Sequence, residues 1–147
     1  MECRRGADEE VKMTSQSKQI KVVAAVIRRE NAVFATQRGY GAYKDWWEFP
    51  GGKVEPGETP ENALVREIRE ELNTKISVDE FLVTVEYVYP EFHLSMDCFW
   101  CHIVEGEPVL LEHEAAKWIP LDDLHQVGWL PADVLVIEKI EQDGRSA

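Results

Sequence analysis

The most constraining feature of this sequence is a predicted helix over residues 60–72 with glutamates along the edge of its apolar face. Thr59 is a favourable N-cap residue and Pro60 suits the first helical position. On a helical wheel, one arc of about 100° holds the apolar side chains, which are Leu64, Val65, Ile68 and Leu72. An apolar arc of this width needs a sheet to cover it, so the sequence predicts a layered domain rather than a lone helix.

Three glutamates lie beside or just beyond this arc. Glu67 and Glu71 are one turn apart at its border, and Glu70 lies further round the helix. Like charges at this spacing repel and cost a helix a few tenths of a kcal/mol. A hard divalent cation favours clustered oxygen ligands and would offset that repulsion. An isolated E-x-x-E-E run is more often a solvated face, so the flanking residues decide between the two interpretations.

The flanking residues place the glutamates in a longer pattern. It reads Gly, five residues, Glu, seven residues, Arg-Glu, an apolar residue, any residue and Glu-Glu, and it is met by Gly52, Glu58, Arg66, Glu67, Ile68, Glu70 and Glu71. This pattern resembles the Nudix family, most closely its MutT-type members. Two positions depart from it: Asn73 stands where the family usually has Gly, and Thr74 where it usually has an apolar residue. Asn tolerates the left-handed conformation of a helix C-cap.

The resemblance implies a fold, a metal site and a reaction class. The implied fold is α/β, an α/β/α sandwich with a mixed central sheet. The implied cofactor is Mg²⁺, with Mn²⁺ as a possible substitute. Its ligands by resemblance are Glu67, Glu70, Glu71 and the backbone carbonyl of Gly51, and the three glutamates are also the implied catalytic residues. The order of residues leaves open which glutamate is the general base, with Glu67 one candidate.

A further ligand is implied before the last strand. MutT-type enzymes place a metal-binding glutamate there, and Glu112 falls at the matching position, with Glu114 as its competitor. His113 between them is better suited to a surface or hydrogen-bonding role, because Mg²⁺ prefers oxygen. Glu58 and Arg66 are interpreted as an ion pair that braces the loop against the helix, since Arg is a good bidentate partner for carboxylate.

The implied reaction releases a nucleoside monophosphate and pyrophosphate from a nucleoside triphosphate. Lys53 and Arg38 are candidates to balance phosphate charge, and Arg38 is also a candidate to contact the base. The run Leu130-Pro131-Ala132-Asp133 resembles the CTP pyrophosphohydrolase and 8-oxo-dGTP diphosphatase branch of the family. Asp133 there would read the base by accepting hydrogen bonds. The other interpretation is that Asp133 only complements the dipole of the first helical turn.

Aromatic side chains near the glycine turn are candidates to stack on a base. Trp46 and Trp47 precede the turn, and Phe92 or His93 opens a later strand. Stacking on a nucleobase suits such rings. Trp47 and Phe92 are the preferred candidates, although at least one of the tryptophans is expected to pack in the core instead.

The rest of the chain predicts one domain. Strands are expected at Ile20 to Arg28, Ala32 to Gln37, Ile76 to Tyr89, Phe92 to Val104 and Trp118-Ile119, with a final helix at Pro131 to Ile140. Residues 1–18 are expected to be a disordered arm, 19–142 the domain, and 143–147 a flexible tail. Cys98 and Cys101 spell C-x-x-C on a strand, which would send them to opposite faces and disfavours a zinc or redox site.

Composition narrows the partners. The formal net charge of −12 would repel a polymeric nucleic acid but allows a small anionic substrate paired with metal. No segment is apolar enough to span a membrane, and three cysteines suit a reducing compartment. We therefore expect a cytoplasmic protein, a monomer or homodimer, that acts on small nucleotides. Two alternatives are a hydrolase of ADP-ribose or nucleotide sugars and a non-catalytic, nucleotide-sensing domain.

Overall fold

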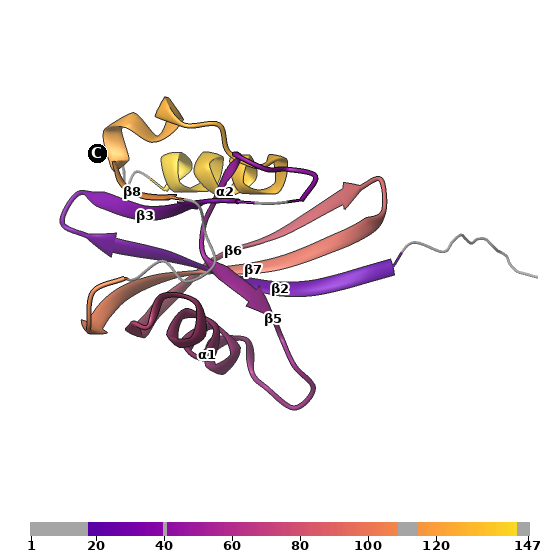
Figure 1. The fold of residues 1–147 in the computed structure, drawn as a ribbon, viewed down its shortest axis with the longest axis horizontal. Coiled ribbons are helices and arrows are strands. Elements are labelled where there is room, and N and C mark those ends of the chain that lie inside the picture. The colour runs from indigo at the N-terminus through magenta and orange to yellow at the C-terminus, as the bar shows by residue number, and fades with distance from the viewer. Residues whose placement is uncertain (1–17, 40, 109–114, 144–147) are drawn as a thin grey trace, which may run out of the picture.

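The computed structural model describes residues 18–39, 41–108 and 115–143. Its elements in chain order are β2 (Lys18–Arg29), β3 (Ala32–Gln37), β4 (Trp47–Glu48), β5 (Gly51–Lys53), α1 (Pro60–Leu72), β6 (Lys75–Tyr89), β7 (Phe92–Glu105), β8 (Ala115–Pro120), the 3₁₀ helix η2 (Leu121–Gln126) and α2 (Pro131–Gln142). The strands form the middle layer, with α1 on one face and α2 on the other (Figure 1). This confirms the predicted α/β/α sandwich.

The sheet is mixed. Its main path runs β4-β3-β2-β7-β6, with β5 paired to β2 and β8 paired to β3. The long central strands β2 and β7 run parallel, with Lys18 opposite Phe92 and Ile27 opposite Cys101. The other pairings are antiparallel, including the predicted hairpin of β2 and β3. The predicted mixed sheet is therefore confirmed.

Strand β2 serves both faces of the sheet. Val23 and Ala25 pack toward α1, whereas Ala24 and Val26 belong to the core beneath α2. This is why its sequence is a continuous apolar run rather than an alternating one. The two cysteines of β7 divide in the same way, as the spacing predicts. Cys98 lies in the α2 core and Cys101 in the α1 core.

Helix α1 begins and ends at the predicted residues. The side chain of Thr59 accepts a hydrogen bond from the backbone N–H of Asn62, 3.1 Å away. Asn73 is the C-cap at φ 53°, the left-handed conformation that Asn tolerates. Thr74 is buried after all, and its hydroxyl donates to the carbonyl of Leu72 at 2.9 Å. Both departures from the Nudix pattern therefore leave the helix end intact.

The buried face of α1 differs slightly from the helical wheel. Leu64, Ile68 and Leu72 are fully buried as expected, but Ala63 is buried in place of Val65, which is only partly covered. The buried face of the helix is therefore rotated slightly about the helix axis, toward Ala63 and away from Val65. The border glutamates nevertheless stay at the edge of the buried face, which is where they need to be to meet the glycine turn.

The domain limits can be compared with the structure only in part. Lys18, expected in the arm, already belongs to β2. Asp143, expected in the tail, is the C-cap of α2. Residues 1–17 and 144–147 lie outside the described residues, so the arm and the tail stay predictions. Within the described residues, no helix has the length and apolarity needed to cross a bilayer.

Candidate active site

A cleft of about 390 Å³ runs between the N-terminal end of α2, the turn from β4 to β5 and the strand β2. Five of the predicted site residues line it: Arg38, Gly51, Glu71, Phe92 and Asp133. Asp133 comes from the first turn of α2, and Glu71 comes from the last turn of α1. The cleft therefore connects the predicted base-reading residue with the glutamate helix, although these lie on opposite faces of the sheet.

The two glycines of β5 are required by close approaches. A Cβ atom on Gly51 would overlap the backbone carbonyl of Val23 in the adjacent strand. A Cβ atom on Gly52 would overlap the carboxyl group of Glu67. Gly51 thus allows β5 to pack closely against β2. Gly52 allows the Glu67 carboxyl to pack against the turn. This contact explains why a glycine stands opposite Glu67 in this chain.

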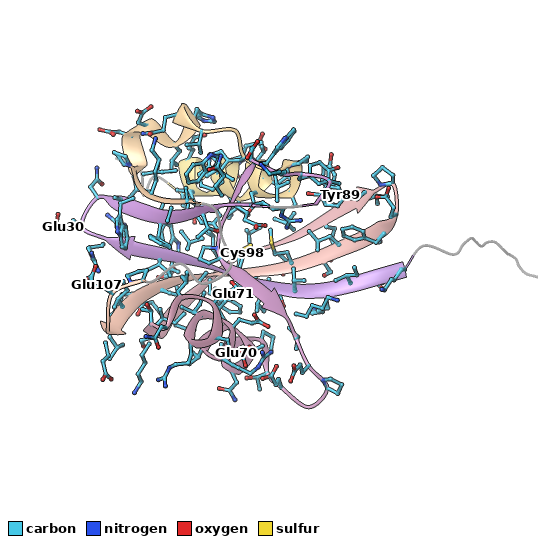
Figure 2. The ribbon with its side chains drawn as sticks, in the orientation of Figure 1. Glu30, Glu70, Glu71, Tyr89, Cys98 and Glu107 are labelled. Carbon is cyan, nitrogen blue, oxygen red and sulfur yellow. The ribbon has the colours of Figure 1, made fainter. Side chains whose placement is uncertain are left out.

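The three glutamates have different surroundings. The Glu67 side chain is only 16% exposed, and burial is the largest cause that raises its pKa, partly opposed by Arg66. Glu71 is hydrogen-bonded to Glu67, and its Oε1 atom is buried. Glu70 is 58% exposed and lies 3.2 Å from Nη1 of Arg66. Glu71 lies on the sheet side of α1 and Glu70 farther from the sheet (Figure 2).

Arg66 holds this edge of the helix in place. Its guanidinium makes two bonds to Glu58, of 2.6 Å to Oε2 and 2.9 Å to Oε1, and a third to the backbone carbonyl of Lys53 at 3.1 Å. The Arg66 hydrogen bonds lower the pKa of Glu58 to about 2, and Glu58 raises that of Arg66. The predicted brace between Glu58 and Arg66 is present. Nη1 of Arg66 also lies 3.1 Å from Oε2 of Glu67.

The edge of α1 offers carboxylate oxygens to a divalent metal. Among residues 18–39, 41–108 and 115–143, no three His, Cys, Asp or Glu side chains already form a metal-binding group. Glu67 and Glu71 are brought together, whereas Glu70 is turned toward Arg66. The donors are all oxygens, and two carboxylates share a partly desolvated edge, so their chemistry fits a hard cation. Glu112, with its competitor Glu114, lies outside the described residues and stays a prediction.

Asp133 is a strongly perturbed acid of the cleft. It is 4% exposed, and burial raises its pKa to about 8, with the nearby charge of Glu48 as the second cause. The backbone N–H of Phe49 donates to its Oδ1 at 3.1 Å, which opposes the shift only in part. At neutral pH this carboxyl is therefore mostly protonated. It presents a donor as well as acceptors, whereas the sequence suggested a carboxylate that only accepts.

The remaining candidates divide between the cleft and other places. Arg38 lines the cleft and pairs with Glu48, 2.9 Å from Nη2 to Oε1. Phe92 also lines it and stacks on Tyr89 with ring centroids 5.1 Å apart. Lys53 is exposed on β5 and does not line the cleft. Trp47 does not line it either; it packs against the core under α2.

Two alternatives left open by the sequence can now be compared. His93 pairs with Glu86 at 2.9 Å and does not line the cleft, so Phe92 is the aromatic residue that the strand presents there. Trp46 is 43% exposed and makes an edge contact with Tyr43. Of the two tryptophans, Trp47 is the one that packs in the core.

The cleft residues that sequence reasoning missed include Tyr43, Glu48 and Tyr89. Glu48 immediately precedes the Phe49-Pro50-Gly51-Gly52 turn, a position that could have drawn attention to it. Tyr89 ends β6 and offered no such signal, because strand periodicity alone treats it as a core residue. Its ring is 6% exposed, yet its hydroxyl reaches α2.

Known proteins are similar to this chain in sequence and fold. The NUDIX domain family matches residues 18–140. The 8-oxo-dGTP diphosphatase of Escherichia coli (strain K12) is 35% identical over 127 residues, covering 85% of this chain and 98% of that protein. The CTP pyrophosphohydrolase of the same strain is 34% identical over 122 residues, covering 82% and 90%. The crystal structure of a MutT NUDIX hydrolase from Burkholderia pseudomallei superposes with a TM-score of 0.75 at 30% identity, covering 84% of this chain and 99% of that one.

Proposed function

We propose a specific reaction for this chain, which belongs to the NUDIX family: hydrolysis of a nucleoside triphosphate to the nucleoside monophosphate and pyrophosphate. The observation that carries the proposal is one continuous cleft that contains both Asp133 and Glu71, together with the glycine turn. One end offers a hydrogen-bonding carboxyl in apolar surroundings, which suits a base. The other end offers carboxylates and tight backbone, which suit a metal-bound phosphate chain.

The preferred bases are those named for two relatives, and a protonated Asp133 is compatible with both. A neutral carboxyl group pairs with a base edge that offers one acceptor and one donor side by side. Cytosine offers its ring N3 and its N4 amino group, and an oxidised guanine offers O6 and the added N7–H. Two relatives are named for such substrates, a CTP pyrophosphohydrolase and an 8-oxo-dGTP diphosphatase. We therefore place CTP, dCTP and 8-oxo-dGTP first among the substrates.

The chemistry rests on the glutamate edge. Nudix hydrolases generally need a divalent metal, and Mg²⁺ (or Mn²⁺) held by Glu67, Glu70, Glu71 and the Gly51 carbonyl would supply charge neutralisation and a more acidic water. The water oxygen bonds to phosphorus while the phosphoanhydride P–O bond breaks, and the leaving pyrophosphate keeps the electron pair. A carboxylate at this edge takes the water proton, with Glu67 as our candidate. Arg66 holds Glu67 in place through a 3.1 Å contact.

Arg38 and Lys53 are assigned to the charge of the substrate. Arg38 lines the cleft beside Glu48, between Asp133 and the glycine turn, so it fits a contact to the base or to a nearby phosphate. Lys53 follows Gly52 at the outer end of β5 and is exposed. It would reach the phosphates only from outside the cleft.

A substrate screen tests this proposal. Wild-type protein with Mg²⁺ is offered CTP, dCTP, 8-oxo-dGTP, dGTP and ADP-ribose, and monophosphate and pyrophosphate are measured separately. We expect pyrophosphate release, with CTP, dCTP or 8-oxo-dGTP turned over faster than dGTP. Release of AMP and ribose 5-phosphate from ADP-ribose, without triphosphate turnover, would show the alternative nucleotide-sugar type of activity. Binding without any turnover would support a sensing role instead.

The cellular setting is part of the proposal. A small nucleotide substrate points to the cytoplasm, and the free thiols of Cys98 and Cys101 suit its reducing conditions. The expected partner is the nucleotide itself, without nucleic acid polymers or membranes. The monomeric or homodimeric state stays a prediction, which light scattering of the purified protein would test.

A further inference from the structure

Helix α2 begins without a side-chain cap of its own. Its N-cap residue is Leu130, whose side chain cannot accept a hydrogen bond, and Pro131 follows at the first helical position. The early N–H groups of a helix have no partner within the helix and need an acceptor from elsewhere. The N–H of Asp133 reaches the carbonyl of Leu130 at 2.9 Å. The N–H of Ala132 needs a different acceptor.

Tyr89 supplies that acceptor from the end of β6. Its hydroxyl oxygen accepts the backbone N–H of Ala132 at 3.2 Å, across 43 residues of sequence. A phenol oxygen that accepts one hydrogen bond can still donate its proton to another group. Tyr89 thus acts as a cap for the helix turn that carries Asp133.

The ring of Tyr89 is fixed on several sides. It stacks on Phe92 at 5.1 Å, meets Tyr43 edge-on at 5.5 Å and lies against Tyr87 at 4.8 Å between ring centroids. Tyr43 and Phe92 are both cleft residues. Figure 2 shows Tyr89 at the end of its strand on the side of α2. The side chain therefore joins two cleft walls to the helix, and it has little freedom to move.

The capped N–H belongs to the residue immediately before Asp133. Burial is the main cause that raises the pKa of Tyr89 to about 12, so its hydroxyl keeps its proton at neutral pH. The Asp133 carboxyl is anchored separately by the N–H of Phe49. Together the two hydrogen bonds restrain the orientation of the Asp133 carboxyl relative to the cleft.

We propose that Tyr89 is a positioning residue for base selection, whose hydroxyl fixes the first turn of α2 so that Asp133 presents its carboxyl to the base in one orientation. This inference rests on the proposed function of the cleft. Tyr89 acts through Asp133 and has no part in bond cleavage. Loss of its hydroxyl should therefore reduce the discrimination among bases, while the rate of phosphoanhydride cleavage stays the same.

The first test compares Tyr89→Phe with the matched control Tyr87→Phe. Tyr87 lies on the same strand against Tyr89, and its hydroxyl has no hydrogen bond among the residues the structure describes. For Tyr89→Phe we expect the ratio of kcat/KM between preferred and disfavoured bases to fall about fivefold, through KM rather than kcat. Amide exchange at Ala132 should speed up by a similar factor, about fivefold. Both measurements should stay at the wild-type level in Tyr87→Phe.

The second test separates positioning from general packing. If Tyr89 acts through Asp133, then adding Tyr89→Phe to Asp133→Ala should change the base ratio no further. A purely structural role would give independent losses that add. Additive losses would overturn the inference. So would a base ratio that is unchanged in Tyr89→Phe but strongly reduced in Asp133→Ala. Neither result would contradict the proposed function.

A third test applies if the proposed function itself fails. If the wild-type protein cleaves no triphosphate, that function fails, and the inference is then judged by the affinities of CMP, dGMP and 8-oxo-dGMP measured calorimetrically without metal. A preference among these that Tyr89→Phe weakens would support the positioning role. No preference, or one that Tyr89→Phe leaves unchanged, would overturn it.

Discussion

The backbone N–H of Phe49 donates a hydrogen bond of 3.1 Å to Oδ1 of Asp133, joining two points 84 residues apart in the sequence. The bond ties the turn between β4 and β5 to the first turn of α2. It also assigns the two oxygens of the acid. Oδ1 accepts from the backbone, so a proton on this buried carboxyl belongs on Oδ2. At the Asp133 end of the cleft, the bond leaves Oδ2 as the oxygen that is not held by Phe49.

The first prediction is a pH dependence of stability. Burial raises the pKa of Asp133 from 3.8 to about 8 in the folded chain, so between about pH 4 and pH 8 the folded state holds one more proton than the unfolded state. The stabilisation from this difference is full below about pH 4 and is lost as the pH rises toward 8. We expect the free energy of unfolding to fall with rising pH across this window, measured by urea titration.

The control is Asp133→Asn, a neutral isostere that still accepts from Phe49. The variant should lack this proton-linked loss, so the stability difference between variant and wild type should grow in favour of the variant as the pH rises. A difference that stays constant from pH 5 to about 8 would contradict a raised pKa for Asp133.

The second prediction concerns base ranking at the same residue. Asp133→Ala removes both donor and acceptor and should cut the discrimination between cytosine and guanine triphosphates by about tenfold. Asp133→Asn keeps a donor and an acceptor, so it should retain the ranking at neutral pH. Wild-type discrimination should decline as the pH passes about 8, where the acid loses its donor proton, while the Asn variant should not change. Ranking that is identical in all three proteins would remove Asp133 from the base site.

Much of the fold could be predicted because its signals are local. The cap at Thr59, the left-handed Asn73 and the apolar run of β2 each depend on neighbouring residues only, and each was confirmed. The glutamate spacing is local as well, since it follows one helix. The glycine and glutamate pattern therefore indicates the NUDIX family from the sequence alone. Even so, Val65 and Ala63 exchanged burial, because a wheel does not show from which direction the sheet arrives.

The base end of the cleft could not be predicted in the same way. Glu48, Tyr89 and Asp133 come from three separate elements, and only the packed fold brings them together. The protonation of Asp133 depends on its burial, and burial cannot be read from the amino-acid type alone. Trp47 illustrates the reverse case: it had the chemistry of a stacking residue, but its pairing beside Trp129 places it against the core.

The third prediction separates the two glycines of the turn. In Gly51→Ala the new methyl group would meet the backbone of Val23, which cannot move away without disturbing the sheet, so we expect a clear drop in melting temperature. In Gly52→Ala it would meet the end of the Glu67 side chain, which can rotate aside. That variant should keep its fold and lose kcat by about 100-fold or more, because Glu67 is displaced.

The control for both glycines is Gly128→Ala. Gly128 is exposed and has open space where a Cβ atom would stand, so melting temperature and kcat should remain near wild type. The assignment of Glu67 to the chemistry would be wrong if Gly52→Ala retained full activity while its Glu67 was shown by crystallography to have moved.

The fourth prediction tests the metal assignment at Glu71. Glu71→Gln keeps the size and hydrogen-bonding capacity of the side chain but removes a negative charge from the buried edge next to Glu67. We expect kcat to fall by orders of magnitude, and Mg²⁺ to bind more weakly in calorimetry. The fold should be retained, because glutamine can keep the hydrogen bond to Glu67. Chelation of metal from the wild-type protein should likewise stop turnover, and added Mg²⁺ should restore it.

Two variants of the same helix sharpen this test. Glu61→Gln removes an equal charge from the exposed first turn of α1 and should leave kcat and Mg²⁺ affinity unchanged, which excludes a general effect of net charge. Glu70→Gln removes the negative charge from the 3.2 Å contact with Arg66 but keeps an acceptor oxygen. If Glu70 only pairs with Arg66, activity should fall by a few-fold at most; if it turns from Arg66 to the metal, the loss should match that of Glu71→Gln. We expect the second result, because Glu70 is exposed enough to rotate and the family pattern gives it a ligand position. A few-fold loss in both glutamine variants would mean that this edge does not hold the metal.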